Sequence, residues 1–352
     1  MSTNSPNQED FPINPSLGKG LLLFFYSQLF VTPKLPTQSF AKRTVIVTGA
    51  NSGLGLEAAR HFYRLNATRL ILAVRTIAKG QEAKEYILQT NPQRCEPDSI
   101  EIWCLDLAST ESTLAFADRV KADLPRLDVL IDNAGINSPE WKLHEGFEQA
   151  VQINVLNTFL LATSLLPKLE ATSATLEENE SPPHLVVVSS EAHRLTKFPE
   201  INAPDLYVKL NERNNFSQQP RYQVTKLMEV LFTRELVARL DSSTSVIINI
   251  VNPGLCSSNL ERNSGKSSAA VRLIRCILDR TTEVGSRTLV LGASAPASSH
   301  GEFQSDGVNQ DVEAWIYTEV GKQAQKKVFE QTMQILEARK LRLAQEAGLR
   351  EL

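Results

Sequence analysis

Tyr222 and Lys226 stand four positions apart in the stretch YQVTK, a spacing suited to proton-transfer chemistry. On a helix it places both side chains on one face. A phenol has a pKa of about 10, too high for a base at neutral pH, and a neighbouring ammonium lowers that pKa. Such a tyrosine can exchange a proton with a substrate oxygen, which Ser190 is suited to hold by a hydrogen bond. Taken alone, such a pair is usually an ordinary helix face, so the rest of the chain has to support this interpretation.

A second group of residues is suited to bind a phosphate. Four β-branched residues at 44–47, typical of a strand buried on both faces, run into Gly49, Gly53 and Gly55. Glycines permit a tight turn and a close approach of the backbone to a ligand. The helix expected from Leu54 onward offers free N–H groups and a partial positive charge at its start. The alternative is a tight turn between strand and helix in some other α/β protein.

Strand-like and helix-like segments alternate along the middle of the chain. Strands are expected at 44–47, 69–74, 99–107, 128–135, 184–190 and 245–254, and helices at 54–65, 77–89, 109–124, 146–169 and 222–240. This alternation predicts an α/β fold with a doubly wound parallel sheet, the Rossmann fold, whose ligands bind at the carboxyl ends of the strands. The glycine turn, Asp106, Asn133 and Ser190 all fall at such ends.

Composition limits the classes of protein to consider. The chain has 352 residues, of which 42% are apolar and 22% charged, as in soluble globular proteins. Its net charge of −3 gives no basic field for nucleic acid, and its four separated cysteines suggest neither a disulfide framework nor a metal site. We expect a cytoplasmic protein with an N-terminal extension at 1–39, one catalytic domain at 40–310, and a C-terminal helix and tail at 311–352.

Two segments add to this core. Gly20–Val31 is strongly apolar but shorter than the roughly 17–25 residues that span a bilayer. We favour packing of this segment on the protein's own surface, and a helix in a membrane interface is the alternative. The long connection 191–221 is expected to act as a lid over an apolar ligand. The side chains suited to that role are Phe198, Leu206, Tyr207 and Phe216. The first fifteen residues are expected to be disordered, and 264–268 to be a mobile loop.

In combination, these segments resemble the short-chain dehydrogenase/reductase family over about Phe40–Gly307. The segment TGANSGLG resembles the family's T-G-x-x-x-G-x-G turn, DNAG its N-N-A-G, VVVSS its serine strand, YQVTK its Y-x-x-x-K, and NPGLCSS its N-P-G segment. The stretch 145–162 is similar to the helix that carries the family's asparagine, here Asn154. The segments GANSGLGLEAARHF, LAVR and GFEQAVQIN are most similar to the retinol-dehydrogenase-like branch, and also to fungal members among secondary-metabolite tailoring enzymes.

The resemblance implies a role for individual residues. Tyr222 is implied as the general acid/base, and Lys226 as the group that lowers its pKa and binds the nicotinamide ribose. Ser190 is implied to orient the substrate carbonyl, and Asn154 to hold a water of a proton relay. No metal is implied. The residues implied in cofactor binding are Gly49, Asn51, Ser52, Gly53, Leu54, Gly55, Arg75, Lys79, Asp106, Asn133, Ala134, Gly135, Tyr222, Lys226, Pro253 and Gly254.

Three departures from the family pattern stand out. Asp132 replaces the first asparagine of N-N-A-G, which we expect to be harmless. Asn157 stands where a glycine often follows the helix asparagine, which puts close packing of that helix in question. The 32 positions from Ser190 to Tyr222 exceed the usual gap, because 191–221 is inserted. The substrate pocket is therefore not expected to copy that of a compact relative.

The end of the second strand bears on the choice of cofactor. NAD enzymes usually offer an acid there, whereas a basic residue accommodates the 2′-phosphate of NADP. Here Arg75 ends the strand, Lys79 follows, and no acid is present. We therefore predict NADP(H) and, as the working direction, reduction of a small apolar carbonyl substrate to an alcohol.

Two other functions fit the same fold. A non-catalytic nucleotide-binding regulator would have no need of Asn154, Ser190, Tyr222 and Lys226. A nucleotide-sugar epimerase would space its glycines as G-x-x-G-x-x-G, unlike Gly49, Gly53 and Gly55. The sequence leaves the substrate and the formation of a homo-oligomer open.

Overall fold

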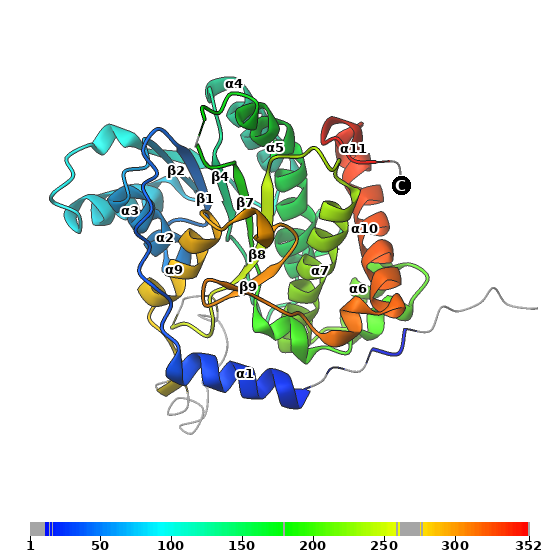
Figure 1. The fold of residues 1–352 in the computed structure, drawn as a ribbon. Helices are drawn as coiled ribbons and strands as arrows, with labels where there is room; N and C mark the ends of the chain where they lie inside the picture. Colours follow the sequence, from blue (N-terminus) through cyan, green and yellow to red (C-terminus); the bar gives the residue numbers. More distant parts are fainter. Residues whose placement is uncertain are drawn as a thin grey trace, which may run out of the picture.

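Eight strands form one sheet through the middle of the molecule, in the order β10-β9-β8-β7-β4-β1-β2-β3 (Figure 1). Their bounds are β1 (Thr44–Thr48), β2 (Arg69–Val74), β3 (Ile100–Cys104), β4 (Val129–Asp132), β7 (His184–Val188), β8 (Ile247–Asn252), β9 (Phe303–Ser305) and β10 (Val308–Gln310). All neighbouring pairs are parallel except β9 and β10. The order reverses between β1 and β4, the position where doubly wound sheets bind their ligands. This computed structural model describes residues 11–13, 15, 17–178, 180–257, 260, 275 and 277–350.

Helices cover both faces of the sheet, and each face has its own hydrophobic cluster. On one face lie α2 (Gly53–Arg64), α3 (Ile77–Gln89) and α9 (Thr282–Gly292); on the other lie α4 (Thr110–Asp123), α5 (Thr158–Ser173), α7 (Gln218–Arg239) and α10 (Glu319–Arg339). Val45 and Val47 point into the first cluster and Ile46 into the second. This alternation explains why β1 is apolar at every position, because both of its faces are buried.

The sheet and helices confirm the predicted α/β class, with differences at the edges. The strands β9 and β10 have only three residues each, and neither was expected. A small hairpin of β5 (Leu143–His144) and β6 (Phe147–Glu148) occupies the start of the helix expected at 146–169. That helix begins later, as a π-helical segment η2 (Val151–Asn157) that continues into α5.

The insertion 191–221 forms short helical pieces that pack on the domain. They are η3 (Glu191–Leu195), η4 (Pro199–Asn202), α6 (Leu206–Leu210) and η5 (Arg213–Asn215). Phe198, Leu206 and Tyr207 are buried in the cluster that includes the side chains of α10, and the Tyr207 hydroxyl lies 2.6 Å from Thr332 Oγ1. The expectation that these three side chains cover a ligand is therefore wrong, because they belong to the core. Phe216, the fourth, is half-buried with its ring 5.4 Å from that of Trp141 and does not line the cavity described below.

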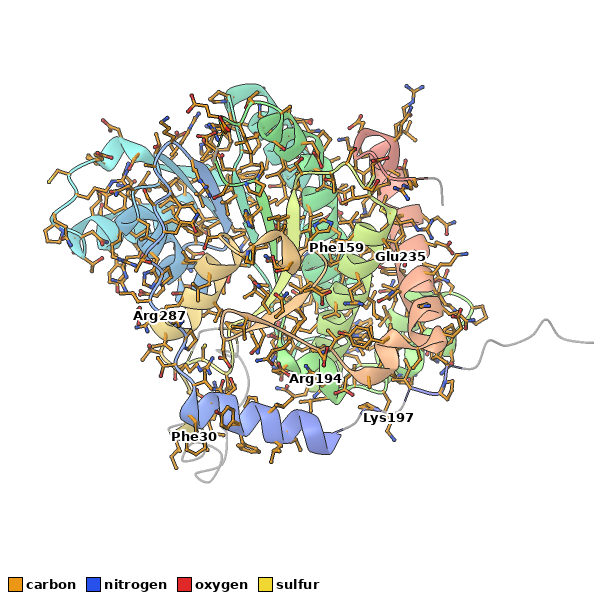
Figure 2. The ribbon with its side chains drawn as sticks, in the orientation of Figure 1. Phe30, Phe159, Arg194, Lys197, Glu235 and Arg287 are labelled. Carbon is orange, nitrogen blue, oxygen red and sulfur yellow. The ribbon has the colours of Figure 1, made fainter. Side chains whose placement is uncertain are left out.

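The apolar N-terminal segment forms α1 (Leu17–Phe30), which runs along one edge of the molecule (Figure 1). As predicted, α1 packs on the domain, but its contacts are made largely through polar groups. Its Leu22 and Phe30 are 73% and 76% exposed, and Phe30 lies at the molecular edge (Figure 2). Neither α1 nor any other helix in the described part of the chain is long and apolar enough to cross a bilayer.

Short elements complete the described structure. They are η1 (Pro97–Ser99), η7 (Ala297–Ser299), η8 (Ala314–Tyr317) and α11 (Leu343–Glu346). The expected disorder of the first fifteen residues is wrong for 11–13, where Phe11 and Ile13 are buried and the N–H of Phe11 donates to Asn202 Oδ1 at 2.7 Å. Residues 1–10, 14 and the expected loop at 264–268 lie outside the described residues.

Candidate active site

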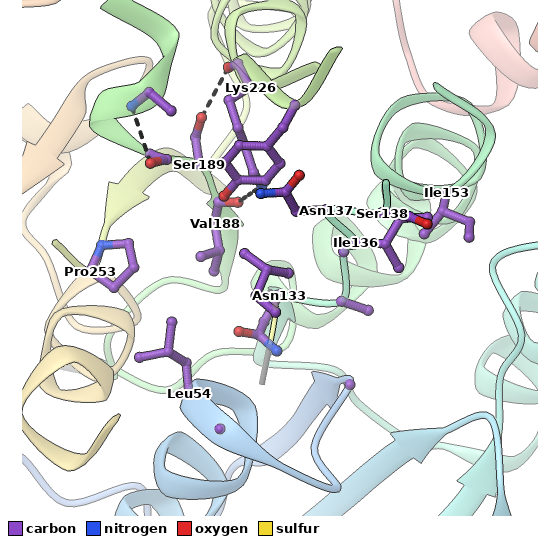
Figure 3. Close-up of a pocket in the computed structure, with 18 of the residues that line it drawn as sticks. Leu54, Asn133, Ile136, Asn137, Ser138, Ile153, Val188, Ser189, Lys226 and Pro253 are labelled. Carbon is purple, nitrogen blue, oxygen red and sulfur yellow. Dashed lines mark hydrogen bonds between the residues drawn. The ribbon is translucent and has the colours of Figure 1, made fainter. Parts of the chain in front are cut away.

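A cavity of about 870 Å³ opens at the carboxyl ends of the parallel strands. Figure 3 shows part of its wall, from Leu54 of α2 to Lys226 of α7. Of the residues predicted for the site, the following line the cavity: Gly49, Asn51, Ser52, Gly53, Leu54, Arg75, Lys79, Asp106, Asn133, Ala134, Gly135, Ser190, Tyr222, Lys226, Pro253 and Gly254. Gly55 and Asn154 are not part of the lining, and both lie directly behind it. The structure therefore brings together groups that are spread over about two hundred positions of the chain.

The glycine turn after β1 has the shape of an anion cradle. Gly49 and Gly53 have φ angles of +66° and +60°, a region that favours glycine. A Cβ atom on Gly55 would lie 2.6 Å from the Gly49 oxygen and 2.6 Å from Asn133 Nδ2. Ser52, at the N-cap of α2, makes no side-chain capping hydrogen bond, so no hydroxyl obstructs the first N–H groups of the helix. These features fit a dinucleotide pyrophosphate.

The end of β4 supports this turn from beneath. Asn133 Nδ2 donates to the Thr48 oxygen at 2.8 Å, and the N–H groups of Asn133 and Ala134 both donate to Thr48 Oγ1 at 2.9 Å. These bonds join the carboxyl ends of β1 and β4, the two strands between which the order reverses. Asn133 thus holds the glycine turn in place as well as lining the cavity.

The far end of the cavity carries positive charge. Arg75 and Lys79 are exposed and line it, and within the described residues neither has a salt bridge. Asp106 lines the same region, and its Oδ1 accepts the N–H of Ala108 at 3.0 Å. This end can therefore receive an additional anionic group, such as a phosphate on a ribose.

The residues suited to proton transfer lie at the opposite end. Lys226 Nζ is 5.7 Å from the centre of the Tyr222 ring and donates to the Val188 oxygen at 2.9 Å (Figure 3). Ser190 Oγ accepts the N–H of Ala192 at 3.1 Å, which leaves its own proton available to a substrate oxygen. Ser189 Oγ donates to the Lys226 oxygen at 3.0 Å and fixes the start of α7 against β7. A phenol, an ammonium and a hydroxyl thus meet on one wall.

Asn154 lies behind this wall, within the π-helical segment η2. Its Oδ1 accepts the N–H of Ile136 at 2.8 Å, and its Nδ2 donates to the Ile136 oxygen at 3.0 Å and to Thr225 Oγ1 at 3.1 Å. These bonds connect the loop after β4 to α7. Its role in holding a water stays a prediction.

Asn157, which stands where a glycine is usual, lies at the end of the π-helical segment η2 and is held by hydrogen bonds to other segments. It is fully buried, and its Nδ2 donates to the Leu107 oxygen at 2.8 Å. Its Oδ1 accepts Arg339 Nη1 of α10, also at 2.8 Å. The amide therefore takes the place of close backbone packing and ties the helix to the C-terminal helix α10.

Among the residues at or behind the cavity that were not found from the sequence, two sets bear on the chemistry and the shape of the site. Gly20, Leu21 and Phe24 of α1 line its mouth, although α1 precedes the predicted catalytic domain. Glu229, one turn beyond Lys226, lies with its Oε1 2.8 Å from Lys226 Nζ. The i,i+3 spacing was visible in the sequence, but such pairs are usually solvent-exposed.

Charge around Lys226 is closely balanced. Burial alone would lower the pKa of Lys226, but the Glu229 carboxylate and Tyr222 outweigh that effect, and its pKa is raised. Lys226 is therefore an ammonium ion at neutral pH. A charged group in this position favours the phenolate form of Tyr222.

Comparisons with known proteins agree with this geometry. The family model for short chain dehydrogenase matches residues 43–198. The chain is 40% identical to the short chain dehydrogenase/reductase dmxR8 of Cryptosporiopsis sp. over 320 residues, or 90% of this chain and 97% of that protein. It is 36% identical to the short-chain dehydrogenase anuD of Penicillium roqueforti, over 97% of this chain and 91% of that one.

Solved structures share the fold at lower identity. A putative short chain dehydrogenase from Pseudomonas syringae superposes with a TM-score of 0.56, at 21% identity, over 78% of this chain and 98% of that one. One from Shigella flexneri, complexed with NADP, gives a TM-score of 0.53, also at 21% identity, over 78% of this chain and all of that one. With relatives of 36–40% identity matched over nearly their full length, the chain belongs to the short-chain dehydrogenase/reductase family, oxidoreductases that act on alcohol and carbonyl groups.

Proposed function

We propose that this protein is an NADP-dependent reductase of a small, largely apolar carbonyl compound in secondary-metabolite biosynthesis. One observation carries the proposal: a single cavity joins Tyr222, Lys226 and Ser190 at one end to the glycine turn and Arg75 at the other. A dinucleotide bound along it would be held by the glycine turn, with Tyr222 and Lys226 available to its nicotinamide side and Arg75 to its adenosine side.

The choice of NADP rests on the charge at the adenosine end. A 2′-phosphate placed there meets the guanidinium of Arg75 and the ammonium of Lys79, both without a salt bridge among the described residues. Within the cavity lining, no acid follows β2 to bind a free ribose hydroxyl. Solved relatives from Shigella flexneri and Escherichia coli, complexed with NADP and NADPH respectively, are consistent with this choice.

The protein's own groups would handle the proton. When bound, the reduced cofactor supplies the hydride. Ser190 donates a hydrogen bond to the substrate carbonyl oxygen, and Tyr222 gives that oxygen its phenolic proton as negative charge develops. The Lys226 ammonium stabilises the phenolate that remains. With a third N–H beyond those given to Val188 and Glu229, it can also bind the nicotinamide ribose.

The cavity offers an apolar surface to a substrate. Leu21 and Phe24 of α1 contribute to it, together with Leu195, Leu255 and Leu260. An apolar substrate displaces water from such a surface at a gain of about 25 cal/mol per Å². Ser190 and Tyr222 bind the carbonyl, and Gln219 and Gln223, which flank Tyr222 on α7 and also line the cavity, are available to polar groups elsewhere on the substrate.

Replacement of Tyr222 by phenylalanine tests the proposed chemistry. We expect kcat for NADPH-dependent reduction, measured against a panel of ketones and aldehydes, to fall at least about 100-fold, since the proton donor is lost. The Kd for NADPH should stay nearly constant. Tyr86→Phe is the matched control, because it removes a hydroxyl that lies outside the cavity and contacts Glu57. Near-normal turnover by Tyr222→Phe would refute the mechanism.

We also propose a cytoplasmic location, with α1 held on its own domain. The placement of α1 on the domain is supported by hydrogen bonds of Gln28 and Arg280, which join α1 to the segments around Leu255 and Leu278. Because several apolar side chains of α1 are exposed, contact of this helix with a membrane surface is the alternative. Sedimentation of the full-length protein with liposomes distinguishes the two.

A further inference from the structure

Glu229 stands behind the proton-transfer wall, where the reaction proposed above gives it no task. It follows Lys226 by one turn of α7, and its Oε1 lies 2.8 Å from Lys226 Nζ. The two residues are 3% and 6% exposed, so this is a buried ion pair. The ammonium also donates to the Val188 oxygen at 2.9 Å. Two of its three N–H bonds are therefore fixed by the protein, and the third is free to point into the cavity.

A second carboxyl group, from Asp132, lies near the same pair. Asp132 is the last residue of β4, and its side chain lies on the same face of the sheet as that of Leu130. Leu130 packs in the hydrophobic cluster that also contains Leu227 and Val230 of α7. Its side chain is 4% exposed, and its Oδ2 has no hydrogen-bond partner among the described residues. The same holds for Glu229 Oε2. The buried pair of Lys226 and Glu229 thus has a further buried carboxyl group on its Glu229 side.

Three ionisable groups in such a place cannot all be charged without leaving a net negative charge in the interior. Burial, reinforced by the Glu229 carboxylate, raises the pKa of Asp132 well above its ordinary value. Burial also raises the pKa of Glu229 to about 7, and Lys226 opposes that rise. The arrangement of lowest charge has a neutral Asp132 and an ion pair between Lys226 and Glu229. Tyr222 is the remaining titratable group that faces the ammonium.

We propose that Glu229 is a positioning residue, which keeps the Lys226 ammonium charged and directs its free N–H toward the cofactor ribose. Asp132 acts as the neutral acid that accompanies the pair. This inference depends on the proposed function only in placing the nicotinamide ribose against Lys226. It differs from a purely structural role, in which the ion pair would stabilise the fold and leave cofactor binding independent of pH.

Cofactor binding as a function of pH tests the proposal without a substrate. Kd values for NADPH are measured by fluorescence near pH 7 and near pH 9 for the wild type, Glu229→Gln and Glu229→Asp. Without the carboxylate, burial lowers the pKa of Lys226 against a smaller opposing effect, so the protonated fraction of Lys226 should fall as the pH rises, and with it the charge-assisted hydrogen bond to the ribose. We expect the Kd of Glu229→Gln to rise roughly tenfold between the two pH values. The wild type and Glu229→Asp, which keep the charge, should change by less than about threefold.

Glu235→Gln is the matched control on the same helix. Its carboxylate pairs with Arg239 and not with Lys226 (Figure 2 labels its position). A Glu229→Gln variant whose Kd follows that of the wild type at both pH values would overturn the proposal. The titration is repeated with NADH, which has the same nicotinamide ribose. A wild type that binds NADH but not NADPH would reject the proposed cofactor and still test Glu229.

Thermal unfolding gives an answer that does not depend on any cofactor. Lys226→Met leaves the buried Glu229 carboxyl without its partner, so the Tm of this variant should fall as the pH rises from 7 to 9, because ionisation of the carboxyl then favours the unfolded chain. Adding Glu229→Gln removes the titrating group, so at pH 9 the double variant should have a higher Tm than Lys226→Met alone. A double variant that is no more stable than Lys226→Met at this pH would show that the two groups are not coupled, and would also overturn the proposal.

Discussion

The attachment of α1 depends on a buried ion pair whose loss we expect to be measurable. Arg280 Nη1 lies 2.7 Å from Asp306 Oδ1, and both side chains are almost fully buried. Arg280 Nη2 donates to the Ser27 oxygen at 2.8 Å and to the Val31 oxygen at 3.0 Å, and Ser27 Oγ donates to Asp306 Oδ2 at 2.7 Å. Arg280 and Asp306 thus hold the last turn of α1, together with the hydrogen bonds of Gln28.

Asp306→Asn removes the charge and keeps the shape. Asp306 has a φ of +57°, and asparagine tolerates this left-handed region, so the backbone should not add a cost of its own. Breaking a buried ion pair by removing one partner typically costs about 3–5 kcal/mol. Because Arg280 keeps the carbonyls of Ser27 and Val31 as acceptors, we expect the lower end, about 3 kcal/mol, for the local attachment of α1.

Limited proteolysis and steady-state kinetics together measure this effect. We expect cleavage near the end of α1 to accelerate by roughly 100-fold, since about 3 kcal/mol corresponds to two powers of ten in the population of the detached form. The KM for an apolar substrate should rise, because Leu21 and Phe24 leave the cavity wall. The Kd for NADPH should rise less, since the glycine turn is untouched.

Asp98→Asn is the control, because Asp98 is exposed and lies away from α1. Equal cleavage rates and equal KM values for Asp306→Asn and Asp98→Asn would refute the argument that this ion pair holds the wall of the pocket. A changed KM without faster cleavage would show that Asp306 acts on the substrate by another route.

Two further predictions concern cofactor choice and acid stability. Arg75→Asp should weaken NADPH binding by about 1.5–3 kcal/mol and NADH binding much less, and equal losses for both cofactors would show that Arg75 does not contact the 2′-phosphate. For His61, burial, reinforced by Arg64, lowers the pKa from 6.5 to about 4. Because the unfolded chain then binds a proton that the folded chain does not, stability should be complete above pH 6.5 and fall as the pH drops toward 4, by up to about 3 kcal/mol from this group. Urea unfolding at several pH values should show a shallower decline for His61→Gln than for the wild type, and parallel curves would contradict the assignment.

The sequence was sufficient to predict the centre of the fold and most of the cavity wall. Buried parallel strands produce unbroken apolar runs, so β1 and β2 could be placed from residue types alone. Because the carboxyl ends of parallel strands meet at one edge, residues as distant as Gly49 and Tyr222 were expected to lie together.

What escaped prediction depends on contacts between distant segments. Phe198 and Tyr207 in an insertion suit a lid or a core equally well, and their burial against α10 decides between the two. The pairing of Asn157 with Arg339 spans 182 positions and leaves no local pattern. Glu229 resembled a surface charge, since the sequence does not show that this turn of α7 is buried.

The position of α1 has a consequence for how this enzyme can diversify. The groups for proton transfer come from β7 and α7, whereas part of the wall facing the substrate comes from a helix encoded before the first strand. Recombination upstream of β1 would exchange that wall and leave the reaction chemistry intact. Chimeras that join the first forty residues of a fungal relative to this chain therefore offer a direct route to altered substrate range. Conversely, a gene that lacks only the codons of α1 would encode a protein that keeps the residues for proton transfer and loses part of the wall facing the substrate.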